Sequence, residues 1–429
     1  MIPIPQLPDS LDVLARTALL LIAAVALAEV GQRRLGLPRV TGYVLAGVLM
    51  GPGVLQWAPL SISGELRPFM LLGLGLLLFE LGSRVDLRWL KANPWLLATS
   101  VGEAALTFVG AYVFLKLAGM STAIAFTVAA IAVSSSPTVV MRVVSETGAR
   151  GQMTQRLLLL SALNSLYAIL LLKFGYALIH LDQGGDPLRA IAHPLYQASG
   201  SFLLAVVVAF AMHLAQSAGL RRESERFAIV IAILLLASNA ADLLGLSVPM
   251  VLLVAGMLLR TRSGRLVLFP EHFGAAGALL VVLLFVLTGL AISPAQVAAG
   301  GGLALGLLVV RAGAKWLGAW WSAGRGGLAP RKAGWLGVAL LPMSSLAVLQ
   351  AYEVAGLYPP IDSAAPAAAD TASRTAEALA TTASSAEVLA IVLGAVAVME
   401  IAGPILTQVA LRRAGEAAPA ARTETTSRA

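Results

Sequence analysis

Apolar stretches of about twenty residues recur along the whole chain, and they constrain its fold more than any other feature. A helix that crosses the hydrocarbon core of a bilayer needs about 17–25 mostly apolar residues. About thirteen such stretches lie near residues 11–31, 38–56, 66–82, 94–117, 121–146, 154–180, 193–216, 225–243, 246–260, 271–291, 296–320, 333–357 and 386–411. The charged residues are correspondingly few, at 12% of the chain, against about 25% in soluble domains. We therefore predict an all-α, polytopic membrane protein.

The distribution of Lys and Arg tests this count independently. Segments that follow the odd-numbered stretches hold 22 of the 30 Lys and Arg residues, whereas the N-terminus and the segments after even-numbered stretches hold four. Because cytoplasmic loops are enriched in Lys and Arg, we expect a multi-pass protein of the bacterial inner membrane with its N-terminus outside and its C-terminus in the cytoplasm. The Ala-, Ser-, Thr- and Pro-rich segment 358–387 is predicted to be a flexible extracytoplasmic loop. Residues 414–429 are predicted to be a disordered cytoplasmic tail.

Proline and hydroxyl side chains interrupt two of the apolar stretches. The fifth stretch contains "SSSPT" (134–138) and the twelfth contains "LLPMSSLAV" (340–348). Each interruption is either a proline kink stabilised by hydroxyls or a broken helix whose polar groups face an ion. Interruptions at corresponding places in two halves of a chain are typical of a transporter with its site near the bilayer midplane. We predict unwound segments that face each other, with Ser135, Thr138 and Ser344 among the ion-binding residues.

Charged side chains inside a membrane are costly and are therefore functional candidates. Counted from the cytoplasmic end at about 1.5 Å per residue, four polar residues lie at a similar depth: Glu103, Asn164, Arg311 and Glu400. We predict that Arg311 and Glu400 form a fixed structural ion pair. Glu103 is then either part of an ion site or a satisfied buried carboxyl. Lys173 and Lys315 are expected to extend toward the two membrane surfaces.

Five stretches share the pattern of one known family. They are "RRLGLPRVTGYVLAGVLMGPGVL" (33–55), "LLGLGLLLFELGSRVDL" (71–87), "LLGLSVPMVLLVAGMLL" (243–259), "LLFVLTGLAIS" (283–293) and "GPILTQVALRR" (403–413). In this order they resemble the cation:proton antiporter-2 family, the Kef-type potassium and sodium exchangers. The resemblance implies a transmembrane domain over 1–413, with about thirteen helices in two inverted repeats and two crossed discontinuous helices.

The same resemblance implies a division of labour between helices. Scaffold helices, at about 11–82 and 225–291, form a homodimer. Transport helices, at about 94–180 and 296–411, move with the bound ion across the membrane as an elevator.

The sequence departs from the family's pattern at the ion site. In the sixth stretch the family carries an Asn-Asp, Asp-Asp or Gln-Asp pair, whose aspartate holds the cation or a proton in turn, and here the pair is Asn164–Ser165. The family's Gly-Glu after the second interruption is also missing, and Ser344 and Ser345 stand there. A serine offers oxygen to an ion, but it does not titrate near neutral pH. If a proton is exchanged, another group must carry it, and we expect Glu103 to be that group.

The function that we predict is a monovalent cation (Na⁺ or K⁺):proton antiporter that works by an elevator mechanism. One alternative is a transporter of the same fold that has lost proton coupling or carries another solute. A second alternative is a non-transporting membrane sensor or assembly partner. Because the sequence shows no metal-ligand spacing, phosphate loop or nucleophile–base pattern, we expect no cofactor and no enzyme activity. Because the basic residues recur in small groups between the apolar stretches and do not form one patch, we expect no nucleic-acid partner.

Overall fold

The computed structural model describes residues 13–51, 54–57, 67–182, 186–217, 223–263, 274–292, 294–343, 345–355 and 371–418. In chain order the helices are α1 (Val13–Leu35), α2 (Arg39–Met50), α4 (Arg67–Arg84), α5 (Leu87–Ala92), α6 (Pro94–Leu117), α7 (Thr122–Val133), α8 (Pro137–Thr147), α9 (Gln152–Asp182), α10 (Pro187–Ser217), α11 (Glu223–Leu243), α12 (Val248–Ser263), α13 (Gly274–Leu290), α14 (Pro294–Ala323), α15 (Pro330–Ala339), α16 (Ser345–Ala355) and α17 (Thr371–Arg413). Within these ranges no residue is in a strand.

The helices match the thirteen predicted stretches. The fifth stretch is the broken pair α7–α8, the twelfth is the broken pair α15–α16, and the short α5 is an addition between the third and fourth. Seven of the helical segments are long and apolar enough to cross a membrane, and three more are shorter apolar helices. The prediction of an all-α, polytopic membrane fold is confirmed.

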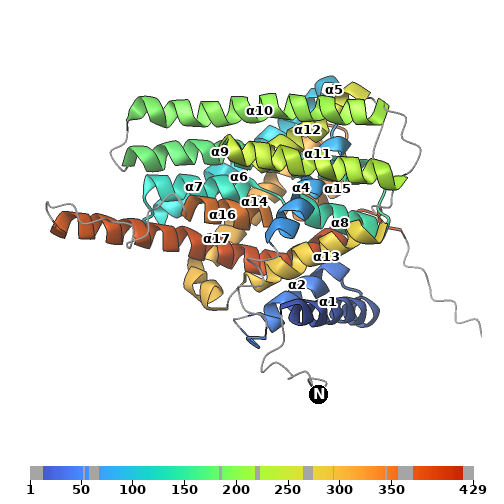
Figure 1. The fold of residues 1–429 in the computed structure, drawn as a ribbon, viewed down its shortest axis with the longest axis horizontal. Helices are drawn as coiled ribbons and strands as arrows, with labels where there is room; N and C mark the ends of the chain where they lie inside the picture. The colour runs from blue at the N-terminus through green and yellow to red at the C-terminus, as the bar shows by residue number, and fades with distance from the viewer. Residues whose placement is uncertain are drawn as a thin grey trace, which may run out of the picture.

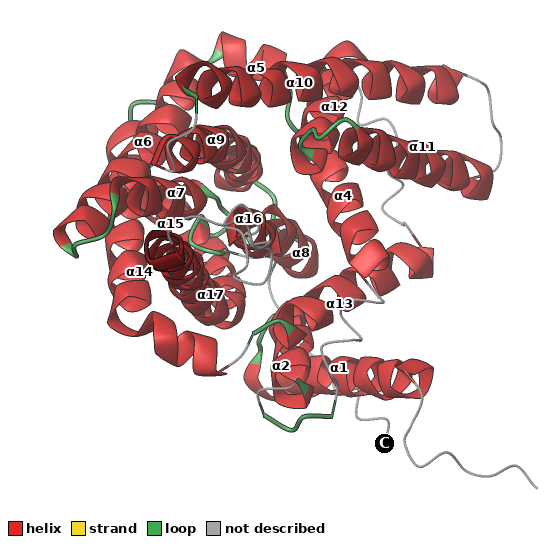
Figure 2. Cartoon of the chain, turned by 60° about the vertical axis from the view of Figure 1, so that its left-hand side comes forward, coloured by secondary structure: helices red, strands yellow, loops and turns green. Residues whose placement is uncertain are grey.

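The helices form two groups that Figure 2 separates clearly. The first, which we call the arc, consists of α1, α2, α4, α11, α12 and α13. The second, which we call the bundle, consists of α6–α9 and α14–α17. Helix α10 packs against α9 of the bundle and against α11 and α12 of the arc. Within the arc α2 packs on α13 and α4 packs on α12, which is the mirrored order that two inverted repeats produce.

Glycines allow very close crossings in the arc. A Cβ atom at Gly47 or Gly289 would lie 2.2 or 2.3 Å from a carbonyl oxygen across the α2–α13 crossing. The same atom at Gly82 or Gly256 would lie 2.1 or 2.3 Å from a carbonyl oxygen across the α4–α12 crossing. Helices in a membrane associate through such small residues because apolar side chains gain little by leaving lipid for protein. Each crossing thus joins one helix of the first repeat (α1–α9) to one of the second (α11–α17).

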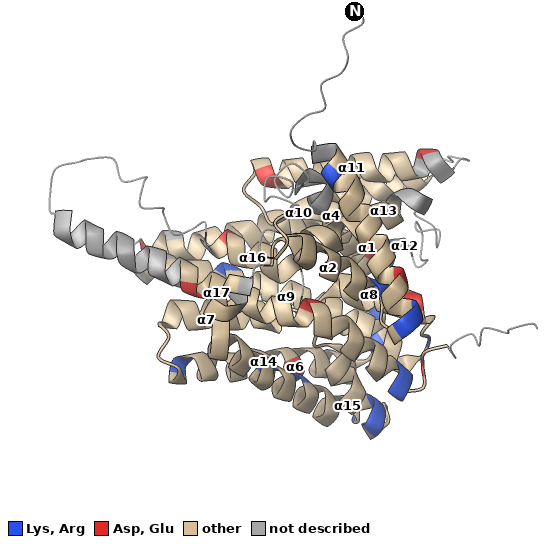
Figure 3. Ribbon diagram, turned by 90° about the horizontal axis from the view of Figure 1, so that it is seen from below, with Lys and Arg blue, Asp and Glu red and all other residues tan. Residues whose placement is uncertain are grey.

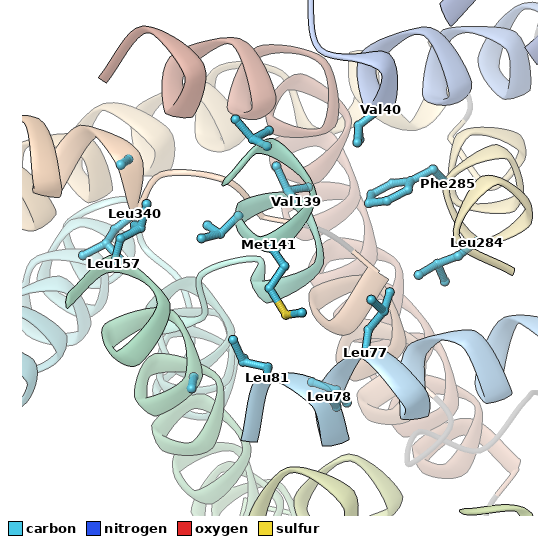
Figure 4. Packing of buried hydrophobic residues seen from close by; sticks show 14 of the residues in the cluster. Val40, Leu77, Leu78, Leu81, Val139, Met141, Leu157, Leu284, Phe285 and Leu340 are labelled. Atoms are coloured by element: carbon cyan, nitrogen blue, oxygen red, sulfur yellow. The ribbon is translucent and has the colours of Figure 1, made fainter. Parts of the chain in front are cut away.

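Apolar side chains fill the contact between the bundle and the arc. Figure 4 shows Val139 and Met141 of α8 facing Leu77 and Leu81 of α4 and Phe285 of α13. All five side chains are buried. Helix α8 therefore packs against the arc through apolar side chains.

Most Lys and Arg residues lie at the end of the molecule where α8 ends and α15 begins (Figure 3). At this end the carboxylate of Glu146 accepts a hydrogen bond of 2.9 Å from the backbone N–H of Arg39, the first residue of α2. The same carboxylate pairs with Arg142 at 2.9 Å. One charged group of the bundle thus caps a helix of the arc at the basic end.

The segment 358–387 does not follow the prediction of a flexible loop throughout. Helix α17 begins at Thr371, so 371–387 is helical, and only the part before Thr371 lies outside the described residues. The segment is rich in Ala, which has the highest helix propensity, and it runs without interruption into an apolar span. The composition of the segment therefore suggested a loop where α17 extends beyond its apolar span.

The predicted disordered tail is also wrong in part, because residues 414–418 pack against the bundle. The carboxylate of Glu416 accepts hydrogen bonds from the backbone N–H groups of Met153 (3.1 Å) and Thr154 (2.8 Å), and it pairs with Lys332 at 2.8 Å. Burial alone would raise the pKa of Glu416, but the bonds from Lys332 and from the start of α9 outweigh it and hold this pKa below its usual range. Residues 419–429 lie outside the described part of the chain.

Candidate ion site where two broken helices cross

The first break is an extended stretch at residues 134–136. Helix α7 ends at Val133 and α8 begins at Pro137, which fits the first turn of a helix because proline has no N–H to satisfy there. The Oγ atom of Ser136 caps α8 by accepting the N–H of Val139 at 3.2 Å. Thr138 is consequently helical rather than unwound, and its Oγ1 lies 3.1 Å from Oγ of Ser136.

The two breaks touch each other, as the sequence predicted. The backbone N–H of Ser136 donates to the carbonyl oxygen of Pro342 at 2.7 Å. The hydroxyl of Ser135 donates to the carbonyl oxygen of Leu340, also at 2.7 Å. The second break runs between the end of α15 at Ala339 and the start of α16, and Ser344 within it lies outside the described residues.

Arg311 of α14 satisfies the backbone groups that the breaks leave without helical partners. Its guanidinium is fully buried and donates to the carbonyl oxygens of Ala132 (2.7 Å), Ser134 (2.6 Å) and Leu341 (2.5 Å). These carbonyls lie at the C-terminal ends of α7 and α15, where each helix dipole places partial negative charge. One arginine therefore neutralises the converging ends of two half-helices.

The predicted ion pair of Arg311 with Glu400 is wrong. The guanidinium is occupied by the backbone carbonyls, and both carboxylate oxygens of Glu400 are buried without a hydrogen-bond partner in the described part of the chain. Depth along the membrane places two residues at one level, but it does not tell which faces of their helices meet. The orphan carbonyls at the breaks were the stronger attraction for Arg311, and substitution of Glu400 is not expected to strand it.

Glu103 of α6 is instead paired with Lys315 of α14. The Nζ atom of Lys315 lies 2.6 Å from Oε1 of Glu103, and both side chains are fully buried. Nζ also donates to the carbonyl oxygen of Val133 at 3.1 Å. The expectation that Lys315 extends toward the membrane surface is therefore wrong. Its spacing of four residues from Arg311 places both cations on one face of α14, and this spacing was the signal in the sequence that could have identified it.

Asn164 of α9 links Glu103 to the first break. Its Nδ2 atom donates to Oε2 of Glu103 at 2.8 Å and to Oγ of Ser135 at 3.2 Å. Ser165 donates to the carbonyl oxygens of Ser135 (3.2 Å) and Ser161 (2.9 Å). The structure thus brings together Glu103, Asn164, Ser165 and Ser135 among the residues that the sequence singled out.

The amide oxygen of Asn164 is a candidate cation ligand. Oδ1 is buried and accepts no hydrogen bond within the described residues, while Nδ2 of the same amide makes two. A buried polar atom without a partner costs about 1–3 kcal/mol, so its presence calls for an explanation. Amide and carboxylate oxygens are both ligands that hard cations prefer.

A second buried lysine is also paired rather than extended to the surface. Nζ of Lys173 lies 2.7 Å from Oε1 of Glu353, and it stands over the ring of Tyr176 at 4.6 Å from the centroid. The lysine is 3% exposed and the carboxylate 45% exposed. The prediction that Lys173 reaches the membrane surface is wrong, because its ammonium forms an ion pair with Glu353, near the end of α16.

A buried cluster of charged and polar groups where two broken helices cross is typical of secondary membrane transporters. The profile of the family described as "Sodium/hydrogen exchanger, transmembrane" matches residues 19–413. The chain belongs to this family, and the protein is a multi-pass membrane protein.

Two known proteins resemble parts or all of the chain. The Na⁺/H⁺-K⁺ antiporter GerN of Bacillus cereus is 40% identical over 88 residues, which cover 20% of this chain and 22% of that protein. The chain therefore spans about a fifth of this curated relative. The solved structure of the sodium proton antiporter MjNhaP1 from Methanocaldococcus jannaschii has a similar fold, with a TM-score of 0.69 and 17% identity over 94% of this chain and 99% of that one.

Proposed function

We propose that the protein exchanges a monovalent cation, Na⁺ or K⁺, for a proton across the inner membrane of a bacterium. The observation that carries this proposal is the buried ion pair of Glu103 and Lys315 beside the open amide oxygen of Asn164. The names of the similar proteins, which are antiporters of Na⁺, K⁺ and H⁺, support the same ions.

Competition for one carboxylate couples the two ions. In this scheme the amide of Asn164 turns so that Oδ1 in place of Nδ2 faces Glu103. A cation that binds Glu103 and Oδ1 then takes the place of the Lys315 ammonium, which lies 2.6 Å from the same carboxylate. Two positive charges beside one buried carboxylate repel each other strongly. Lys315 therefore releases its proton when the cation enters and regains one when the cation leaves. The site stays neutral in both states, so one cation exchanges for one proton.

Glu103 acts as the cation ligand in this scheme, and its neighbour Lys315 carries the proton. This differs from the role expected from the sequence, in which Glu103 itself took up the proton. The difference follows from the partner that Glu103 has: a carboxylate bonded to an ammonium is already charge-compensated.

We further propose that the bundle moves against the arc to carry the site across the membrane, and that two copies associate through their arcs. The apolar packing around α8 (Figure 4) supports such a movement, because side chains without directional bonds can slide past one another. In this arrangement the basic end of the molecule is cytoplasmic. A protease site placed in 356–370 should then be cut in intact spheroplasts, and cleavage confined to inverted vesicles would reverse the orientation.

Ser165, which stands where the family carries an aspartate, favours a second candidate function, cation transport without proton coupling. A serine bonded to two backbone carbonyls adds no titratable group to the site. A transporter that moves a cation without proton coupling would need none.

Everted membrane vesicles with a pH-sensitive dye distinguish these functions. In the wild type we expect Na⁺ or K⁺ to cause dequenching of the dye. Glu103→Gln removes the cation's charged ligand and should abolish the signal, and Lys315→Gln should abolish proton movement while cation uptake persists. Lys116→Gln, at an exposed position that bonds the loop after α6, is the matched control and should behave as wild type. Cation uptake without dequenching in the wild type would favour the uncoupled transporter, and dequenching that survives both Glu103→Gln and Lys315→Gln would refute the proposed site.

A further inference from the structure

Helix α17 runs directly against the second break. A Cβ atom at Gly403 would lie 2.9 Å from Cα of Pro342, so the absence of a side chain there lets the two backbones meet. One turn further on, the hydroxyl of Thr407 donates to the carbonyl oxygen of Ala339 at 3.2 Å. Residues spaced by three and four lie on one face of a helix. Glu400, three residues before Gly403, shares the face of α17 that is turned toward the break.

Glu400 differs from the other buried acids that the structure describes. Its side chain is fully buried, and neither of its carboxylate oxygens has a hydrogen-bond partner within the described ranges. Glu103 is bonded by an ammonium and an amide, and Glu416 is bonded by an ammonium and two backbone N–H groups. These partners compensate the charge of the two other acids.

The charged and titratable groups on neighbouring helices do not compensate Glu400. The helices that pack against α17 are α2, α7, α8, α14, α15 and α16, and of these α7 carries no titratable group. The groups on the other five helices are Arg39, Tyr43, Arg142, Glu146, Arg311, Lys315, Arg331, Lys332, Tyr352 and Glu353. Arg311 bonds backbone carbonyls, and Lys315 bonds Glu103. None of the ten bonds either oxygen of Glu400 in the described structure.

A carboxylate in this setting is most stable as a neutral acid. Burial of an ionised carboxylate without a partner costs several kcal/mol, and such a group takes up a proton instead. The position of Glu400 in the fold indicates a role for this proton in transport. In the two inverted repeats α17 is the counterpart of α9, so the acid beside the second break corresponds to Asn164 and Ser165 beside the first.

We propose that Glu400 is a second proton-binding site of the bundle, separate from the pair of Glu103 and Lys315. In the conformation described here the carboxyl group holds its proton. When the second break opens to water, the O–H bond breaks, the proton leaves to water and the carboxylate is solvated. The second repeat thus retains a titratable group at its break, whereas the first repeat has lost the aspartate and relies on the ion pair between α6 and α14.

Infrared spectroscopy of the purified full-length protein at neutral pH tests this directly, and it needs no transport activity. A protonated carboxylic acid has a C=O stretching band that shifts on exchange into D₂O. We expect the wild type to show such a band, Glu400→Gln to lose it, and Glu103→Gln to retain it because Glu103 is charge-paired. Glu400→Asp should move the band rather than remove it, which separates loss of the acid from misfolding.

The proposal is overturned if the wild type shows no such band, or if the band survives in Glu400→Gln. It is also overturned if Glu400→Gln leaves the pH dependence of cation-driven proton movement unchanged in a wild type that exchanges ions. A wild type that does not exchange ions would refute the proposed antiport, but the infrared result would stand by itself. The two proposals therefore fail separately.

Discussion

Replacement of Arg311 by Met should remove most of the stability of the crossing between the two broken helices. Three carbonyl oxygens lie 2.5–2.7 Å from the guanidinium. A hydrogen bond to a charged group contributes about 1.5–3 kcal/mol, so the loss amounts to roughly 5–9 kcal/mol. The free energy of unfolding of a typical domain is about 5–15 kcal/mol. We therefore expect Arg311→Met to be poorly folded or strongly destabilised.

Arg311→Lys should fall between the wild type and Arg311→Met. An ammonium keeps the positive charge, but it is a compact point donor that cannot bridge the ends of α7 and α15 as a planar guanidinium does. We expect it to retain about half of the stabilisation. Thermal unfolding of the detergent-solubilised protein, followed by size-exclusion fluorescence, gives the order. Lys116→Met is the control, because the loss of an exposed charge usually changes stability by less than about 0.5 kcal/mol.

The result that would refute this reasoning is equal unfolding temperatures for Arg311→Met and Lys116→Met. Such a result would mean that the carbonyls at the breaks find other donors without cost. A well-folded Arg311→Met protein with a less stable Arg311→Lys would contradict it as well, since desolvation of the charge would then outweigh the bonds that it makes.

Three further predictions concern other contacts. At 2.6 Å and an effective dielectric constant of 20, the attraction between Glu103 and Lys315 is about 6 kcal/mol before desolvation. Lys315→Met alone should therefore lower stability by about 3–5 kcal/mol, and adding Glu103→Gln should recover part of this loss. Strictly additive effects in a double-mutant cycle of unfolding temperatures would contradict the interaction between the two residues. Glu416→Gln should lower stability by about 1–2 kcal/mol. Because the folded-state pKa of Glu416 lies below its usual range, this contribution is present above about pH 4 and is lost as the pH falls through the folded-state pKa. A difference in stability between wild type and variant that stays constant down to about pH 3 would be evidence against it. Gly289→Val should destabilise the protein by about 1–3 kcal/mol or more, because its Cβ would lie 2.3 Å from a carbonyl oxygen. Gly313→Ala should be tolerated, because no heavy atom of another part of the chain lies within 4 Å of the added Cβ. Thermal unfolding of both variants tests the difference.

Much of the fold was predictable from local sequence. The length of the apolar stretches predicted the helices of the membrane fold, because this signal acts within about twenty residues. The breaks were predictable for the same reason: Pro137 and the serines before it cannot continue a helix without loss of backbone bonds. The meeting of the two breaks followed from their corresponding positions in two repeats.

The contacts of the site were harder to predict because they depend on which faces of distant helices meet. Glu400 and Arg311 lie at one depth and yet do not pair, and the orphan carbonyls that Arg311 binds cannot be counted until the breaks are placed. Lys315 was misjudged because its distance from a helix end suggested an exposed ammonium, while its partner Glu103 is remote in sequence. Residues 414–418 have a composition typical of a free tail, and only their contacts with Lys332 and with the start of α9 explain why Glu416 is held.

The glycine crossings of the arc also bear on how the chain is assembled during synthesis. Gly47 on α2 meets its partner on α13 only after more than half of the chain has been made. At about 5–20 residues per second the wait is on the order of tens of seconds. During that time the glycine faces of α2 and α4 lack the helices that cover them in the complete fold. Newly inserted first repeats are therefore open to association with the wrong partner, including the second repeat of a neighbouring chain, until their own α12 and α13 arrive.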